Sequence, residues 1–375
     1  MKLSYLIVLV SGMLLPVFAY AQNNDDLLNL LIRKNVLTTK EADSLRAAVK
    51  SPQQTDNANQ HGIYIGSRAL QLSGLVQTEY EGYQQTGKIN TFSLHRVRLD
   101  VKGDIGDGWS YEVYTEFAGA NPKLLDAYAN YKVADFLKIT AGQFKVPYSL
   151  ESLIADADLD FIDRTQVVNA LAGRSTDVIG NQNGRDVGAQ ISGSFLKVDG
   201  RYLFDYYFGV FNGAGYDVTT DNNDHKDLAG RLAVHPLKNL SIAADFYSGQ
   251  GVFTVTSAAA TTNTRNRRGI DARYVLGNLA LQAEYDRGTD ATLNRVGWYG
   301  HATYFVWRNK LQLAVRYDWY DPTQTIQTDR TINYTGGVNY YFNKWARATV
   351  DYIYVREQTT QIPNNLFEAQ LQVSF

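Results

Sequence analysis

The sequence predicts an all-β fold, a 16-stranded antiparallel transmembrane β-barrel that follows a short N-terminal helical arm. Three observations support this prediction. From residue 63 onward, apolar and polar residues alternate with a period of two, as they do along a pleated strand. The alternation recurs in about sixteen segments that are bounded by turn residues. The connections between these segments alternate between short and long, which is the asymmetry of outer-membrane barrels.

The composition agrees with this fold class and excludes others. Charged residues make up 20% and apolar residues 45% of the 375 residues, which excludes a helical membrane protein with repeated apolar runs of about 20 residues. Aromatic residues make up 13% of the chain, which argues against disorder. The formal net charge of −2 provides no basic field that would attract nucleic acid. The absence of cysteine excludes disulfides and thiolate metal sites.

The first 21 residues have the features of an export signal. Met1-Lys2 supplies a positive start, residues 3–18 are mostly apolar, and Ala19-Tyr20-Ala21 fits the small-x-small cleavage rule. The alternative is a single transmembrane anchor, but the apolar stretch is short and ends in a cleavage pattern. We therefore expect residues 1–21 to be a signal peptide and the mature chain to begin at Gln22.

Residues 22–50 are predicted to form a periplasmic helical arm. Leucines recur at helical spacing within residues 25–34, and residues 38–41 have the sequence of a capping box for a second helix. Two helices this short cannot bury a core alone, so they either require a partner surface or form a mobile extension. Residues 51–62 are polar and predict a linker to the barrel at 63–375.

The predicted strands are clearest where the alternation is strict. In residues 311–320, Leu313 and Val315 share one face, and Arg316 and Asp318 share the other. The same pattern continues to the last residue of the chain. The predicted strands are 70–82, 92–103, 109–118, 124–133, 137–147, 185–195, 201–211, 226–235, 239–249, 268–276, 279–287, 295–307, 310–320, 331–342, 345–356 and 366–375.

The connections predict how the barrel is oriented. Every second connection is short, such as residues 134–136 and 343–344, and most of the intervening ones are longer, such as 212–225, 250–267 and 288–294. An even number of strands that starts on the short-turn side brings both chain ends back to that side, which is the periplasm for bacterial barrels. We therefore expect the helical arm in the periplasm and the long loops outside the cell.

The polar faces of the predicted strands carry many charged residues, which indicates a pore. A barrel of this strand number is too wide for side chains to fill, so its lumen holds water. Charges that would be costly in a dry core stay solvated in a channel and select ions there. Arg273 and Arg347 are among the basic residues that this pattern places toward the lumen, whereas His95 falls on the lipid-facing side of its strand.

The longest predicted connection is residues 148–184. Long loops in compact folds usually have a function, so we expect a constriction loop that folds into the pore, with an ordinary extracellular loop as the alternative. Most of its charged residues are acids, namely Glu151, Asp156, Asp158, Asp160, Asp163 and Asp177, and its bases are Arg164 and Arg174. The run Asp-Ala-Asp-Leu-Asp has the odd spacing of a calcium loop but lacks the glycine and the glutamate that such a loop requires, so no metal site is predicted.

Several segments of the chain resemble the phosphate-selective porin O and P family. The resemblance lies in the order and spacing of modest motifs and covers nearly the whole mature chain, including the Leu-rich arm. The motifs are FSLHRVRL at 92–99, GQFKVPYSLE at 142–151, FIDR at 161–164, GVFNG at 209–213, GRL at 230–232, AVRYD at 314–318 and YYFN at 340–343.

This resemblance implies a trimeric channel for anions, with a ladder of basic side chains that leads to a narrow site. Matched residue by residue, the candidates for that anion path are Arg96, Arg98, Lys145, Arg164, Arg231 and Arg316, and the strand pattern adds Arg273 and Arg347. The terminal Phe375 resembles the signal that the barrel-assembly machinery reads. That machinery, outer-membrane lipid and two further copies of the chain are therefore the expected partners.

We predict a porin of the cell outer membrane that forms a water-filled channel for passive uptake of small solutes, with anions such as phosphate preferred and no cofactor required. A general or cation-tolerant diffusion porin without phosphate selectivity is the first alternative. A barrel enzyme is less favoured, because the five histidines lie in no Ser/His/Asp pattern and no nucleophile-elbow motif occurs. A secreted adhesive β-protein would lack the alternation of loop lengths.

Overall fold

The computed structural model describes residues 63–64, 70–218, 220–254 and 259–375. The chain divides into two units, residues 1–60 and 61–375. The predicted signal peptide, helical arm and linker lie outside the described residues. Within the described ranges, no helix is both long enough and apolar enough to cross a membrane.

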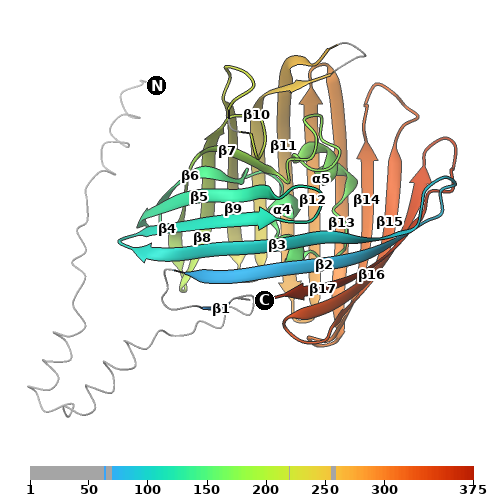
Figure 1. Ribbon diagram of the computed structural model, residues 1–375, viewed down its shortest axis with the longest axis horizontal. Helices are drawn as coiled ribbons and strands as arrows, with labels where there is room; N and C mark the ends of the chain where they lie inside the picture. The colour runs from blue at the N-terminus through green and yellow to red at the C-terminus, as the bar shows by residue number, and fades with distance from the viewer. Residues whose placement is uncertain (1–62, 65–69, 219, 255–258) are drawn as a thin grey trace, which may run out of the picture. The chain divides into compact units, whose positions relative to one another are not determined.

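One antiparallel sheet makes up the second unit (Figure 1). Its elements are β1 (Ile63–Tyr64), β2 (Gln71–Tyr83), β3 (Thr91–Gly106), β4 (Trp109–Glu116), β5 (Lys123–Ala134), β6 (Leu137–Lys145), β7 (Arg185–Val198), β8 (Arg201–Phe211), β9 (Asp227–Leu237), β10 (Leu240–Phe253), β11 (Thr261–Leu276), β12 (Leu279–Asp290), β13 (Leu293–Trp307), β14 (Leu311–Asp321), β15 (Thr331–Tyr341), β16 (Ala346–Glu357) and β17 (Leu366–Ser374). From β2 onward each strand pairs with its chain neighbours, and β17 pairs back with β2. Sixteen strands therefore close into a barrel, as predicted. The short β1 pairs beside β2.

The exposure of the side chains is the reverse of that in a soluble protein. Along β14, Val315 is 60% exposed on the outside, whereas its neighbour Arg316 is only 5% exposed on the inside. Apolar residues also cover the outside of the other strands, for example Leu371 on β17 and Ile270 on β11. An apolar exterior around a polar interior is stable where the surrounding solvent is hydrocarbon, because closed strand pairing satisfies every backbone group.

Each predicted strand coincides with an observed strand, but two predicted loops are shorter than expected. The strand β11 begins at Thr261, and β12 extends to Asp290, so only residues 291–292 connect β12 to β13. Residues 261–267 are polar on both faces of the strand. A strand that rises beyond the hydrocarbon layer needs no apolar face, so the period-two pattern stops before the hydrogen-bonded strand does.

The prediction that His95 faces lipid is wrong. The pairing of β2 with β3 shifts register between Gln77 and Thr78, which pair with Arg96 and Leu94 and leave His95 as an extra residue in β3. Such a bulge turns two successive side chains to the same side of a sheet. The ring nitrogen Nδ1 of His95 therefore lies inside the barrel, 2.6 Å from Oε2 of Glu79.

The last residue of the chain completes the closure of the barrel. Phe375 exchanges two backbone hydrogen bonds with Gly74 on β2, at 2.8 and 3.0 Å. Its ring lies directly over Gly74, because a Cβ atom built on that glycine would be 2.4 Å from Cζ of Phe375. Only glycine at position 74 therefore leaves room for the aromatic ring at the seam.

We expect Gly74→Val to weaken the closed barrel, because the valine would displace the Phe375 ring at a cost of about 1–3 kcal/mol. The measurement is the temperature at which the barrel unfolds in detergent, followed by the mobility shift on electrophoresis. Gly336→Val is the matched control, since a Cβ atom at this strand glycine meets no atom within 4 Å. Equal unfolding temperatures for the two variants would contradict the prediction.

Candidate functional site

The segment 146–184, between β6 and β7, lies inside the barrel (Figure 1). It contains three short helices, α4 (Leu150–Leu153), η1 (Asp156–Asp158) and α5 (Gln166–Leu171). On one wall of the barrel, every second strand carries a carboxylate that accepts a hydrogen bond from a backbone N–H group of the segment, at 2.8–3.1 Å. These pairs are Asp245 on β10 with Ser149, Glu284 on β12 with Glu151, Asp318 on β14 with Gln166, and Asp351 on β16 with Ile162.

Arginines of the same wall bind the carbonyl groups of the segment. Arg316 donates to the carbonyl oxygen of Asp163 at 2.8 Å, and Arg347 donates to that of Leu159 at 2.9 Å. A third arginine, Arg267 on β11, donates to the carbonyl oxygen at the end of α5. The polar wall thus satisfies a loop backbone that would otherwise carry unpaired groups in the interior.

The helix α5 adds an apolar contact to these hydrogen bonds. Its residues Val167, Val168 and Leu171 are fully buried. Two glycines on the wall let the helix approach, since a Cβ atom at Gly288 would lie 2.6 Å from Leu171 and one at Gly297 would lie 2.7 Å from Val167. The segment is therefore packed against the wall as well as hydrogen-bonded to it.

Asp156 is the centre of the opposite, basic part of the lumen. Its carboxylate pairs with Arg98 on β3 and with Arg164 of the segment, and Arg96 lies 3.8 Å away. Arg98 is also held by Glu116 on β4, with 2.6 Å between Nε and Oε2. Burial alone would raise the pKa of Asp156, but Arg164, Arg96 and Arg98 hold it well below its usual range. Asp156 is therefore ionised and links the segment to the β3 wall.

A lumen-facing cavity of about 300 Å³ adjoins this carboxylate. Lys145 lines it, with Nζ held by the carbonyl oxygens of Leu153 and Ile154 at 3.0 and 2.9 Å. Arg185 on β7 lines it too and forms two hydrogen bonds with Asp126. The other charged residues of the lining are Arg98, Glu112, Asp126, Lys138 and Asp156. The cavity therefore presents both signs of charge, with an excess of bases.

The structure divides the predicted basic residues into two groups. Arg96, Arg98, Lys145 and Arg164 converge on Asp156 and the cavity. The others lie along the wall from β9 to β16 and are largely occupied by acids or by the segment. Arg231 pairs with Asp245 and Asp271 at 2.6 and 2.5 Å, Arg273 lies 3.7 Å from Asp160, Arg316 lies 3.7 Å from Glu151, and Arg347 binds Leu159.

The acids of the segment are mostly neutralised where they lie. Glu151 accepts hydrogen bonds from the backbone and side chain of Thr165. Asp160 lies 3.3 Å from Nε2 of His301. Asp163 is half-buried, and Asp158 is exposed. Asp156 and Asp160 are thus taken up by basic side chains, so the Asp-Ala-Asp-Leu-Asp run has the surroundings of an ion-pair network instead of a calcium loop.

Besides Arg267 and Lys138, three more basic residues that the sequence analysis did not select hold the segment or line the cavity. Arg174 binds the side chain and carbonyl of Ser152, Arg185 lines the cavity, and Arg265 pairs with Asp177 at 2.9 Å. Arg185 is the first residue of the predicted strand 185–195, whereas Arg265 lies in the predicted loop 250–267, which the structure shows to be partly strand. The sequence signal for Arg185 is a basic residue that immediately follows the long loop 148–184.

The pairing of Asp177 predicts a loss of stability in acid. Burial alone would raise the pKa of Asp177, but Arg265 and Arg267 lower it from 3.8 to about 2. Because this folded-state pKa lies below the unfolded value, ionised Asp177 stabilises the fold above about pH 4, and the contribution disappears as the pH falls toward 2. Thermal unfolding between pH 5 and 2 measures this, and Asp177→Asn should show a shallower decline than the unaltered protein. Identical declines would contradict the assignment.

Comparison with known proteins agrees with this architecture. The sequence profile of the family described as "Phosphate-selective porin O and P" matches residues 71–375. The chain belongs to this porin family. It is accordingly a porin of the cell outer membrane, and membership of this family points to a channel.

Solved structures show the same fold at low sequence identity. OmpT, an outer membrane protein of Vibrio cholerae, superposes with a TM-score of 0.62 at 15% identity, over 84% of this porin and 100% of that chain. The anion-selective porin from Comamonas acidovorans gives a TM-score of 0.61 at 15% identity, over 82% and 99%. A curated protein of Caulobacter vibrioides, described as uncharacterized, is 24% identical over 177 residues. That alignment covers 46% of this porin and only 34% of the relative.

Proposed function

We propose that this porin carries small solutes by passive diffusion and favours anions. The observation that supports the proposal is the charge of the basic patch around Asp156. Six bases compose the patch and meet three acids, so basic residues outnumber acidic ones by three. The bases are Arg96, Arg98, Lys145, Arg164, Arg174 and Arg185, and the acids are Asp156, Glu116 and Asp126.

The segment 146–184 serves as the constriction in this proposal. It brings Arg164 and Arg174 into the lumen and holds Asp156 where three arginines neutralise it. Solutes that pass the segment on the β3–β7 side would meet Lys145 and Arg185 at the cavity wall. A partly hydrated lumen keeps these charges effective at short range, so an anion would be concentrated there and a cation repelled.

Phosphate is the anion that we propose for this patch. Guanidinium groups bind phosphate oxygens in pairs, and Lys145 adds a point charge beside them. The family to which the chain belongs is described as phosphate-selective, which supports the same solute. The proposal remains one of preference among small anions, since guanidinium and ammonium groups also attract chloride and carboxylates.

Planar-bilayer recording with purified protein tests the proposal. In a potassium chloride gradient, the sign of the reversal potential should show that chloride is more permeant than potassium. Added phosphate should then reduce the chloride current in a saturable way, because the patch would hold phosphate longer. A reversal potential of the opposite sign would refute anion preference, and an unsaturable phosphate effect would refute a phosphate site.

A cation-tolerant diffusion porin is the second candidate, and a specific feature favours it. Four buried acids on β10 to β12 lie near Arg231 of β9, which pairs with only two of them. These acids are Asp245, Asp271, Glu284 and Asp286. The segment covers these acids, and if it leaves this wall they would favour cations, which the same reversal potential would reveal.

We also propose that a signal peptide is cleaved before Gln22, that three copies assemble in the outer membrane, and that Phe375 directs their insertion by the barrel-assembly machinery. One solved form of Vibrio cholerae OmpT, similar in fold with a TM-score of 0.59, is described as a trimer. Cross-linking before and after heating in detergent tests the trimer, and sequencing of the mature N-terminus tests cleavage before Gln22. A monomer under mild conditions, or an intact N-terminus, would contradict these two proposals.

A further inference from the structure

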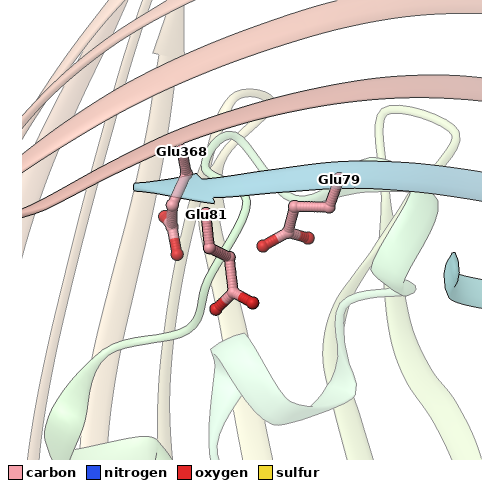
Figure 2. A group of neighbouring side chains, drawn as sticks. All are labelled: Glu79, Glu81 and Glu368. Atoms are coloured by element: carbon pink, nitrogen blue, oxygen red, sulfur yellow. The ribbon is translucent and has the colours of Figure 1, made fainter. Parts of the chain in front are cut away.

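Three glutamates meet inside the barrel where its first and last strands join (Figure 2). Glu79 and Glu81 lie on β2, and Glu368 lies on β17 directly opposite Glu81 in the strand pairing. One carboxylate oxygen from each lies within 4.8 Å of the others. We call these three residues the seam carboxylates. Like charges that face each other across a strand pair repel, so this arrangement opposes the closure of the barrel unless something compensates it.

Glu368 is the member that most clearly lacks compensation. Its side chain is fully buried, at 0% exposure, and points toward the other two carboxylates (Figure 2). Neither of its two oxygens accepts a hydrogen bond in the part of the chain that the structure describes. A buried carboxylate with no donor on either oxygen carries a large desolvation cost, which a bound cation would remove.

The other two seam carboxylates are held in place by neighbours. Nδ1 of His95, at 2.6 Å, and Nε2 of Gln370, at 3.2 Å, both contact Oε2 of Glu79. The hydroxyl group of Tyr83 donates to Oε1 of Glu81 at 2.5 Å. Donors on one oxygen of a carboxylate orient the other oxygen for a ligand, as they do around metal sites in general. The β-bulge at His95 is what brings that ring to Glu79.

We propose that the seam carboxylates bind a calcium ion that joins β2 to β17. Calcium binds carboxylate oxygens at about 2.3–2.6 Å, so two ligand atoms on opposite sides of one ion are about 4.6–5.2 Å apart. The three oxygens lie within 4.8 Å of one another, so a single ion can contact all of them. Magnesium usually keeps several waters and is bound through only one or two carboxylates, so a set of three carboxylates favours calcium. The ion converts repulsion at the closure of the barrel into a link between its first and last strands.

Calcium binding to the detergent-solubilised full chain tests the proposal. Calcium should raise the unfolding temperature of the unaltered protein with a midpoint of roughly 10⁻⁴ to 10⁻³ M, the range of extracellular calcium modules. Glu368→Gln should weaken binding by at least about tenfold, because it removes one of three charged ligands. Glu357→Gln, at the end of the neighbouring strand β16 and outside the cluster, is the matched control and should bind as the unaltered protein does.

The comparison with and without calcium separates a calcium site from a merely structural role. In excess chelator, Glu368→Gln should be at least as stable as the unaltered protein, since it relieves repulsion, and in excess calcium it should be less stable. The proposal would be overturned if the stability of Glu368→Gln differed from that of the unaltered protein by the same amount in chelator and in calcium. It would also be overturned if the stability of the unaltered protein did not depend on calcium. If Glu368→Gln does not fold, the half-buried Glu81 allows the same comparison with Glu81→Gln.

Discussion

Replacing Asp156 by asparagine should detach the segment 146–184 from the β3 wall. The carboxylate is only 4% exposed and pairs with Arg98 and Arg164, with Arg96 at 3.8 Å. Without it, those guanidinium groups remain buried or half-buried and lose their shared partner. Removing one partner from a buried ion pair costs about 3–5 kcal/mol, because the remaining charge is uncompensated.

Two measurements detect this loss. The free energy of unfolding in detergent should fall by that amount, and trypsin should cleave at Arg164 or Arg174 of the released segment. Asp158→Asn provides the matched control, because Asp158 lies two residues away in the same segment and is exposed. Both properties should stay unchanged in this control. An Asp156→Asn variant that resists trypsin as the unaltered protein does would show that other contacts alone hold the segment.

Replacing Lys145 by glutamine should sharply reduce anion preference. Glutamine keeps N–H donors for the carbonyl groups of Leu153 and Ile154 but removes the charge that lines the cavity. A unit charge about 4 Å from a permeating ion contributes about 1 kcal/mol even in bulk water, which is roughly a fivefold change in local anion concentration. The ratio of chloride to potassium permeability should fall by a comparable factor, and phosphate should inhibit the current less.

Lys310→Gln is the control for this substitution. Lys310 also donates to a backbone carbonyl, that of Phe342 at 2.7 Å, but it lies in a short turn between β13 and β14 and does not line the cavity. Its replacement should leave the permeability ratio unchanged. A Lys145→Gln variant with the selectivity of the unaltered porin would remove the cavity from the ion path.

The acidic composition of the segment 146–184 shows why the candidate site could be predicted only in part. From the sequence, its five candidate acids describe a negative constriction. In the structure, Asp156 is surrounded by arginines and Asp160 by His301 and Arg273, so much of that charge is cancelled by residues far away in the chain. Which charge remains free depends on three-dimensional pairing, and neither charge counts nor spacing record that pairing.

The seam carboxylates and His95 show the same limit. Glu79 and Glu368 are separated by most of the chain, and strand closure alone brings them together. The lumen-facing position of His95 depends on one extra residue in β3, which shifts the period-two pattern without changing the composition of the strand. A short stretch of sequence cannot show where a β-bulge inserts one extra residue, because the alternation on each side of the bulge looks regular.

The amino-acid sequence by itself determined the sixteen strands, the polar lumen and the location in a membrane. These features follow from alternation along each strand, which is local, and from the hydrocarbon layer, which requires one apolar face on every strand. Tertiary structure alone decided which lumen charges are cancelled, how the segment 146–184 is bound to the wall, and which carboxylates share the seam. These are pairwise contacts between distant parts of the chain, and their energies depend on distance and burial, which exist only once the ring has closed.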